Sequence, residues 1–198
     1  MTSNNNNFKD HFDNYFNKLS SYFNSEILIN IENLSEELMK IWESNNQLFI
    51  CGNGGSAANA IHIANDLHYG LAQSVKSKKY GMKSDALPAN AAIITCLAND
   101  TGYENIFSNQ LRVKASKDDL LVVLSGSGNS QNIVNALKVS NEIGLNNFAV
   151  LGFDGGVCKE IAKNTIHVPV SDMLVSEDIQ MIIFNICFQW IVKKMNST

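Results

Sequence analysis

Residues 47–66, QLFICGNGGSAANAIHIAND, join a short apolar run to a glycine-rich turn and then to a helical pattern. The apolar run 48–51 predicts a buried strand, and the turn 52–56 has three glycines among its five residues. A strand, a glycine turn and a helix in this order direct free backbone N–H groups and the positive helix end toward an anion. The turn lacks the G-x-G-x-x-G and Walker patterns, so it indicates a phosphate or phosphosugar site, or else a plain strand-to-helix turn.

The helix after this turn carries an apolar stripe and a separate polar pair. The stripe follows three- and four-residue spacing and consists of Ala57, Ala60, Ile61, Ala64 and Leu67. His62 and Asp66 share another face, where they can bind a divalent metal or transfer protons, or form an ordinary surface pair. His68 follows the apolar stripe, so we expect it to pack in the core or to support the site.

The bulk properties of the chain limit its class. It has 198 residues, 45% of them hydrophobic, a net charge of −4 and a pI of about 5.5. These values predict one domain, or a domain with a helical appendage, and argue against direct nucleic-acid binding. The sequence shows no signal-peptide pattern and no apolar run near the ~20 residues of a membrane helix. The four cysteines do not occur in closely spaced pairs; they are Cys51, Cys96, Cys158 and Cys187. This spacing predicts reduced, buried thiols in a cytoplasmic protein.

The N-terminal part differs from the rest of the chain. Residues 1–7 contain four consecutive asparagines and predict a disordered tail. Residues 8–45 carry two amphipathic patterns, which predict an antiparallel helical hairpin. Their apolar faces are richer than covering a small sheet requires, so we expect them to help form a subunit interface. Residues 46–198 are predicted to be the α/β core, and 8–198 a single domain.

Short apolar strands alternate with helices along this core. The expected strands are residues 48–51, 84–87, 120–124, 147–151 and 165–170. This alternation predicts an α/β fold with a doubly wound, mostly parallel five-stranded sheet. Ligands in such folds bind beyond the carboxyl ends of the strands, near the topological switch point.

A second glycine turn follows the clearest strand. Residues 125–130, SGSGNS, place three hydroxyl groups between that strand and a helix. Hydroxyl and backbone N–H groups can surround a phosphate without a lysine, although a flexible turn has the same composition. Two such turns at equivalent places of one sheet favour the binding site.

Four segments together resemble the sugar isomerase (SIS) domain family and, within it, the phosphoheptose isomerases. They are CGNGGSAANAIHIAND, LANDTGYENIFSNQ, LSGSGNSQNIVNAL and an Ile-Gln pair that opens the last helix. The resemblance covers nearly the whole chain, N-terminal helices included. It implies conversion of sedoheptulose 7-phosphate to D-glycero-D-manno-heptose 7-phosphate for bacterial surface heptose synthesis. It also implies a homotetramer with sites where subunits meet.

The resemblance further implies roles for single residues. The positions that match substrate-binding residues are Asn53, Gly54, Gly55, Ser56, Asn99, Asp100, Ser125, Ser127, Ser130 and Gln180. The positions that match zinc ligands are His62, Asp66 and Gln180, and Asp66 also matches the catalytic base. Gly126 stands where the family often has threonine.

Two departures concern catalysis. Asp66 is one methylene shorter than the family's glutamate, so its carboxylate reaches less far. A displacement of this size lowers the rate of catalysis. Phe188 stands where the family has a histidine, and phenylalanine can neither ligate a metal nor transfer a proton. The nearby residues considered as replacements are Asn185, Gln189, Glu177 and Asp178.

The expected reaction is an aldose–ketose isomerisation through an enediol, with Asp66 as base and a divalent metal that polarises the carbonyl oxygen. The alternative is a non-catalytic tetramer of the same family that binds a phosphosugar or associates with the bacterial replication initiator protein. Phe188 and the short Asp66 favour the alternative, whereas the retained His62 and Gln180 favour the enzyme.

Overall fold

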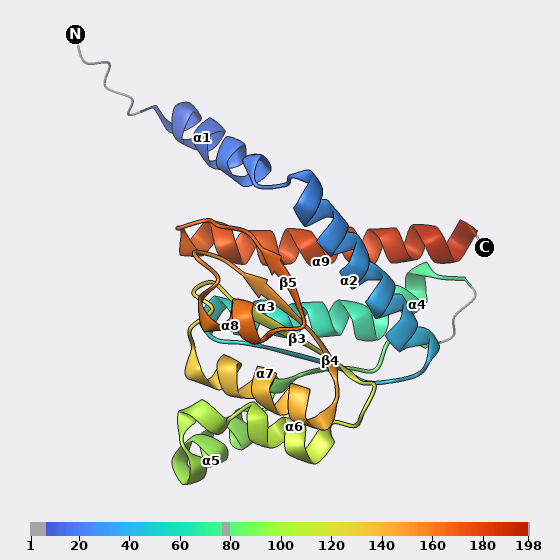
Figure 1. Ribbon diagram of the computed structural model, residues 1–198. Helices are drawn as coiled ribbons and strands as arrows, with labels where there is room; N and C mark the ends of the chain where they lie inside the picture. The colour runs from blue at the N-terminus through green and yellow to red at the C-terminus, as the bar shows by residue number, and fades with distance from the viewer. Residues whose placement is uncertain (1–6, 77–79, 198) are drawn as a thin grey trace.

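The computed structural model describes residues 7–76 and 80–197. Its centre is a five-stranded sheet in the order β2-β1-β3-β4-β5, in which every neighbouring pair of strands is parallel. The strands are β1 (Leu48–Gly52), β2 (Ser84–Ala86), β3 (Leu120–Ser125), β4 (Asn146–Leu151) and β5 (Asn164–His167). Helices cover both faces of the sheet (Figure 1). The predicted α/β class with a parallel five-stranded sheet is confirmed.

The central strands are buried on both faces because their residues are nearly all apolar. In β1, Leu48 and Ile50 face one side of the sheet, while Phe49 and Cys51 face the other. Strands covered on both sides need apolar residues at every position, which is why they appear in the sequence as continuous apolar runs. Each face of the sheet is therefore the floor of its own hydrophobic core.

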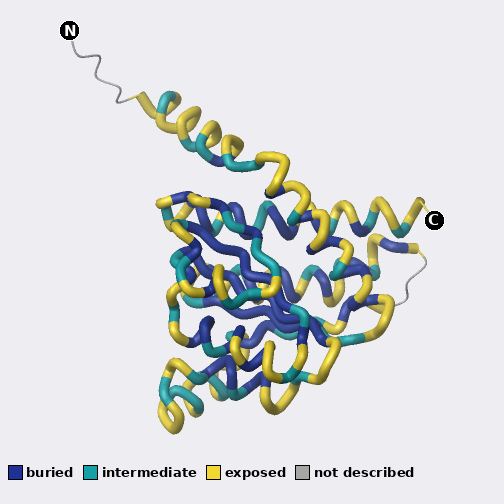
Figure 2. The backbone as a smooth tube through the Cα atoms, in the orientation of Figure 1, coloured by how far each residue is buried: buried dark blue, intermediate teal, exposed yellow. Residues whose placement is uncertain are grey.

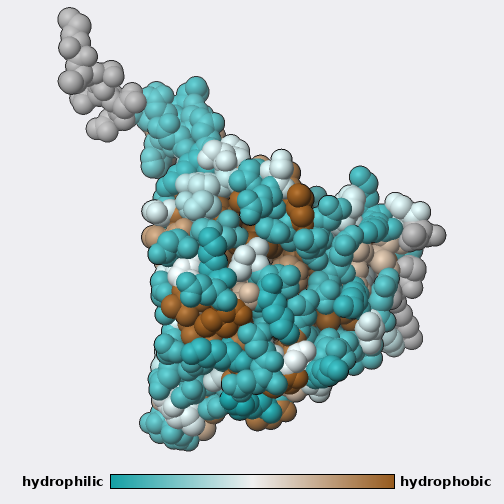
Figure 3. All heavy atoms as spheres, viewed as in Figure 1, coloured by the Kyte–Doolittle hydropathy of each residue, from teal (hydrophilic) through white to brown (hydrophobic). Residues whose placement is uncertain are grey.

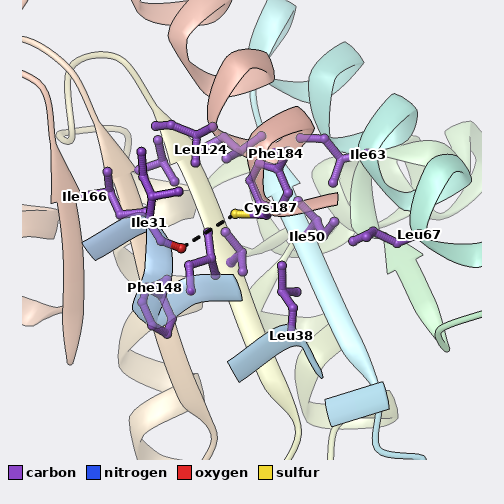
Figure 4. Close-up of a cluster of buried hydrophobic side chains, with 14 of the residues drawn as sticks. Ile31, Leu38, Ile50, Ile63, Leu67, Leu124, Phe148, Ile166, Phe184 and Cys187 are labelled. Carbon is purple, nitrogen blue, oxygen red and sulfur yellow. Dashed lines mark hydrogen bonds between the residues drawn. The ribbon is translucent and has the colours of Figure 1, made fainter. Parts of the chain in front are cut away.

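The first core lies under four helices. They are α2 (Ser25–Glu43), α3 (Gly54–Asn65), α4 (Leu71–Ser74) and α9 (Met173–Ser197). Figure 4 shows Ile31 and Leu38 of α2 with Phe184 and Cys187 of α9 in this cluster beside the strands. The Cys187 thiol donates to the Ile31 carbonyl at 3.8 Å.

The second core lies under the remaining helices. They are α5 (Ala91–Thr101), α6 (Ser108–Lys114), α7 (Gln131–Ile143) and α8 (Gly156–Ile161), with short 3-10 turns η2 (Leu87–Ala89) and η3 (Tyr103–Asn105). α7 buries a full stripe that includes Ile133, Ala136 and Leu137. α5 has an apolar sequence but no buried residue. Cys96 on α5 is therefore exposed, which contradicts the prediction of four buried thiols; the other three cysteines are buried.

α9 is long and apolar enough to cross a membrane by length and composition alone, with 44% of its apolar window buried. It packs against α2 and α3, and its buried residues include the polar Gln180. We therefore interpret α9 as a core helix of this fold.

The two N-terminal helices do not form the predicted antiparallel hairpin. In Figure 1 the chain bends after α1 (Phe8–Ser21) and continues through α2 in broadly the same direction. The Asn24 side chain caps the new helix by accepting the Ile27 N–H at 3.0 Å. The predicted tail 1–7 lies outside the described residues except for Asn7, which caps α1.

α1 contacts the beginning of α9. Lys18 donates to Asp172 at 2.7 Å, and this hydrogen bond lowers the pKa of the Asp172 carboxyl. The Tyr15 hydroxyl donates to Asp178. Figure 2 shows that α1 is nevertheless exposed over most of its length, whereas the strands are buried. α1 is held by Leu19, which is buried in the first core, and by these polar contacts, rather than by a broad apolar face.

Two predictions around α3 are wrong in detail. Ile61 is 44% exposed, because the buried side of α3 runs through Ser56, Ala60 and Ile63 instead. His68 is exposed because the chain forms a π-helical turn at Asp66–Gly70. A π turn holds an extra residue and so rotates the following side chains out of the α-helical register.

The carboxyl ends of β1 and β3 meet at the centre of the sheet, where Gly52 pairs with Leu124. The chain leaves β1 through α3 toward β2 on one side, and leaves β3 through α7 toward β4 on the other. This is the topological switch point, where open parallel sheets bind ligands. Both predicted glycine turns lie at this point.

Candidate active site

The first glycine turn, residues 52–56, is fixed by an amide pair. Asn53 and Asn132 exchange two side-chain hydrogen bonds of 2.9 and 2.8 Å, and the Tyr103 hydroxyl also donates to Asn53 at 3.0 Å. Gly54 has a φ of +55°, a conformation that favours glycine. Asn132 and Tyr103 were not predicted to take part, although both lie within segments that carry the family resemblance.

Ser56 and Gln180 form a buried polar contact between α3 and α9. The Gln180 amide nitrogen donates to the Ser56 hydroxyl at 3.0 Å, and its amide oxygen accepts from Asn59 at 3.0 Å. Gln180 is 1% exposed and Ser56 is 4% exposed. The two predicted substrate residues are thus brought together, and both ends of the Gln180 amide are engaged within the protein.

The second glycine turn, residues 125–130, is shaped by its own hydroxyl groups. Ser125 accepts the Gly128 N–H at 3.0 Å, and Ser127 accepts the Asn129 N–H at 3.3 Å. Ser130 is the N-cap residue of α7, and its hydroxyl makes no capping hydrogen bond there. The turn therefore presents a hydroxyl group and the first N–H groups of a 13-residue helix at the switch point.

A third glycine turn, residues 152–156, packs against the second. Gly128 has a φ of +65°, and a Cβ there would come within 1.9 Å of the Gly155 carbonyl oxygen. A Cβ on Gly156 would come within 2.5 Å of the Asn129 side chain, which accepts the Val157 N–H at 3.0 Å. Close backbone packing, rather than flexibility, is the reason for the glycines at these positions.

His167 on β5 supports this third turn. One ring nitrogen lies 3.0 Å from the carbonyl oxygen of Phe153, and the other lies 3.1 Å from the Lys159 ammonium. Phe153 adopts a φ of +43°, which is strained for an aromatic residue. The contact suits a neutral His167 that donates to the Phe153 carbonyl and accepts from Lys159, and it holds the turn in place.

Gly126 is covered by the first turn of α9. A Cβ at this position would come 2.5 Å from the Met173 sulfur and 3.5 Å from the Ser176 hydroxyl. Met173 therefore fills the space that a threonine at position 126 would need. Nothing in the sequence around Gly126 signals this contact, because Met173 opens α9, which follows only after β4 and β5.

His62 and Asp66 meet on the surface of α3 as predicted, with their nearest atoms 3.2 Å apart. Asp66 also lines a small cavity of about 10 Å³ together with Asn185 and Phe188 of α9. The Phe188 ring packs against Gly70, where a Cβ would lie 3.3 Å from the ring. Phenylalanine thus occupies the position beside the aspartate.

Asn99 and Asp100 lie near the end of α5 and are both exposed. Asn99 donates to Asp100 at 2.7 Å, and the Cys96 thiol donates to Asp100 at 3.5 Å. The hydrogen bond to Asp100 raises the pKa of the Cys96 thiol. No hydrogen bond or ion pair within the described part of the chain joins Asn99 or Asp100 to the glycine turns. The link to this region is Tyr103, three residues further on.

The residues of one chain do not fit the zinc site that the resemblance implies. His62 and Asp66 supply two donors, Gln180 already uses its amide oxygen for Asn59, and Phe188 supplies none. Among the residues that the structure describes, no three His, Cys, Asp or Glu side chains form a group that could hold a metal. Catalytic zinc sites use three protein ligands.

The candidate residues lie at the two ends of α3. The glycine turns meet its first residues, while Asp66 follows its last residue and is roughly 15 Å from Ser56 at 1.5 Å per residue. In one copy of the chain, the phosphate-type turns and the His62–Asp66 pair are therefore separate sites.

Comparison with known proteins supports the resemblance. The SIS domain family model matches residues 11–152. A phosphoheptose isomerase from Aliarcobacter butzleri is 37% identical over 142 residues, which are 72% of this chain and 73% of that protein. One from Akkermansia muciniphila is 39% identical over 139 residues, or 70% and 71% of the two chains. The structure of phosphoheptose isomerase from Neisseria gonorrhoeae superposes with a TM-score of 0.81 at 25% identity, covering 93% of this chain and 96% of that one.

These relatives match most of this chain in sequence or in fold, and they are isomerases by name. The chain accordingly belongs to the SIS domain family, in its phosphoheptose isomerase group, and is a phosphosugar isomerase.

Proposed function

We propose that this isomerase converts sedoheptulose 7-phosphate to D-glycero-D-manno-heptose 7-phosphate, in the route to bacterial surface heptoses. The observation that carries the proposal is the meeting of two hydroxyl-bearing glycine turns at the switch point, in a chain whose relatives are phosphoheptose isomerases. A cytoplasmic location remains a prediction from the four free cysteines.

The phosphate is proposed to bind the second glycine turn. Ser130 and the free N–H groups at the start of α7 would hold its oxygens, with Ser125 and Ser127 shaping the turn. Asn53, Gly54, Gly55 and Ser56 would border the sugar, with Asn53 held in place by Asn132 and Tyr103. Asn99, Asp100 and Gln180 remain proposed substrate contacts.

Asp66 is proposed to move the carbon-bound proton. A carboxylate can take a proton from the carbon next to the carbonyl and return it to the neighbouring carbon of the enediol. Because Asp66 lies roughly 15 Å along α3 from the glycine turns of its own chain, we propose that a neighbouring copy supplies it. His62, 3.2 Å away, would orient this carboxylate.

An assembly of several copies, with a tetramer as the proposal, suits the exposed apolar surface. Figure 3 shows apolar patches on one face of an otherwise mainly hydrophilic surface. Phe8, Phe12 and Phe16 form a stripe on α1 and are 80%, 49% and 54% exposed. An exposed apolar stripe of this kind suits a contact with another copy of the chain.

The mechanism has no step through zinc, because the donors of one chain are too few. Zinc binding stays a prediction, to be tested by metal analysis of the purified protein and by adding zinc to the assay. If zinc binds, it would polarise the substrate carbonyl.

The proposal is tested by incubating the purified protein with sedoheptulose 7-phosphate and following the heptose product by NMR. The proposal is supported if the wild type turns the substrate over and Asp66→Asn does not, while the oligomer and ligand binding of the variant stay unchanged. Binding without turnover would overturn it and favour the regulatory alternative of the family, for which the replication initiator protein is the first partner to test. Retained turnover in Asp66→Asn would remove Asp66 from the mechanism.

A further inference from the structure

The replacement of histidine by Phe188 leaves the chemistry one proton-transfer group short. An aldose–ketose isomerisation moves one proton between two carbons and another between two oxygens. Asp66 is the proposed carrier of the first proton. The structure must supply a second ionisable side chain near the glycine turns.

Two carboxylates near the start of α9 are candidates, and they face different ways. Asp178 accepts the hydrogen bond of the Tyr15 hydroxyl and belongs to the contact between α1 and α9. Glu177 faces the first glycine turn instead. A Cβ on Gly55 would lie 2.2 and 2.4 Å from the two carboxylate oxygens of Glu177, so this carboxylate rests directly on the glycine.

The surroundings of Glu177 are unusual for a structural carboxylate. Its backbone carbonyl accepts the Asn59 side chain at 2.9 Å, which fixes the residue against α3. Its side chain is half-buried, and in the described part of the chain no hydrogen bond or ion pair engages the carboxylate. The carboxylate is therefore partly open to solvent beside the first glycine turn and free to contact a ligand there.

We propose that Glu177 is the second proton-transfer residue of this isomerase, acting on the substrate oxygens. Protonated Glu177 gives its proton to the carbonyl oxygen on C2 while the base takes a proton from C1, which forms the enediol. The Glu177 carboxylate then takes the proton of the hydroxyl group on C1 as the new carbonyl forms and C2 receives a proton. Glu177 ends as it began, and no oxidant or reductant is needed.

This assignment rests on the proposed function, since it assumes an enediol reaction on a sugar phosphate. It also explains the glycine at position 55. Any side chain there would displace the carboxylate from the mouth of the turn.

The test compares Glu177→Gln with Asp178→Asn, which changes the neighbouring carboxylate in the same conservative way. We expect Glu177→Gln to lower turnover by about 100-fold or more, with sugar-phosphate affinity changed by less than about 3-fold. Its pH–rate profile should also lose one ionisation. Asp178→Asn should keep turnover within about 3-fold and keep the full profile, because Asp178 does not face the turn.

Turnover by the wild type tests the proposed function, while the ratio of variant to wild type tests Glu177. Retained turnover in Glu177→Gln, or equal losses in both variants, would overturn the assignment. Glu177→Asp keeps the carboxylate but shortens the side chain by one methylene. A smaller loss of turnover in Glu177→Asp than in Glu177→Gln supports the assignment of Glu177. An equal loss in those two variants, together with weakened sugar-phosphate binding, would assign Glu177 to binding and also overturn it.

Discussion

The two ends of α3 differ in how tightly their residues are packed. At its start, the three glycine turns are locked by backbone packing, as where Gly128 faces the Gly155 carbonyl. At its end, His62 and Asp66 lie on the surface and Phe188 packs on Gly70 through an ordinary apolar contact. Substitution at the first end disturbs the fold, while substitution at the second changes mainly the chemistry.

The largest effect is expected from Gly128→Ala. The new Cβ would meet the Gly155 oxygen at 1.9 Å in a left-handed backbone, so we expect a loss of about 3 kcal/mol in the free energy of unfolding. Sugar-phosphate binding should fall with it. Gly54→Ala is the control: its φ is +55° but no atom lies within 4 Å of the new Cβ, so only about 1 kcal/mol of strain is expected. Denaturant unfolding of both variants measures the difference, and equal losses would contradict the packing argument.

The second prediction returns the family's side chain to the other end of α3. Phe188→His should raise zinc affinity by roughly 10-fold or more, because it adds a donor beside Asp66. It should cost only about 1 kcal/mol of stability, since a partly buried ring is replaced by a smaller one. Zinc titration by calorimetry measures the effect. Phe188→Ala opens the same space without a donor, and equal zinc affinity in the two variants would show that residue 188 does not reach a metal.

The smallest effect concerns α1, whose contact with α9 lies next to Glu177. The hydrogen bond to Asp178, with burial as a lesser cause, raises the pKa of Tyr15 from 10.0 to about 12. The folded state thus favours the neutral phenol, so its stabilisation is complete below pH 10 and disappears as the pH rises through about 12. We expect the wild type to lose stability in this window and Tyr15→Phe to lose less. Unfolding curves at successive pH values check this, and parallel curves would show that the contact does not stabilise α1.

Much of this comparison could be predicted from the residues alone. The apolar runs of β1 and β3 and the glycine turns after them indicated a parallel sheet with an anion site, because period and composition are local properties. The i, i+4 spacing placed His62 beside Asp66, and the 3.2 Å contact agrees. The resemblance also predicted that Phe188 stands in the place of a catalytic histidine.

Other features depend on which elements pack together, and no local pattern encodes that. The predicted helical hairpin was wrong because amphipathic spacing gives a helix its apolar face but not its direction. α2 continues from α1 in broadly the same direction instead of folding back on it. The exposed His68 follows from a π turn that α-helical spacing cannot reveal.

Side-chain types and short-range spacing were enough to predict the fold class, the two glycine turns and the contact between His62 and Asp66. The packing of distant elements was needed to show that Met173 covers Gly126, and that Glu177 rests on Gly55 while Asp178 accepts from Tyr15. The residues in these contacts lie between 47 and 163 positions apart in the sequence, so the contacts arise only when the chain is folded.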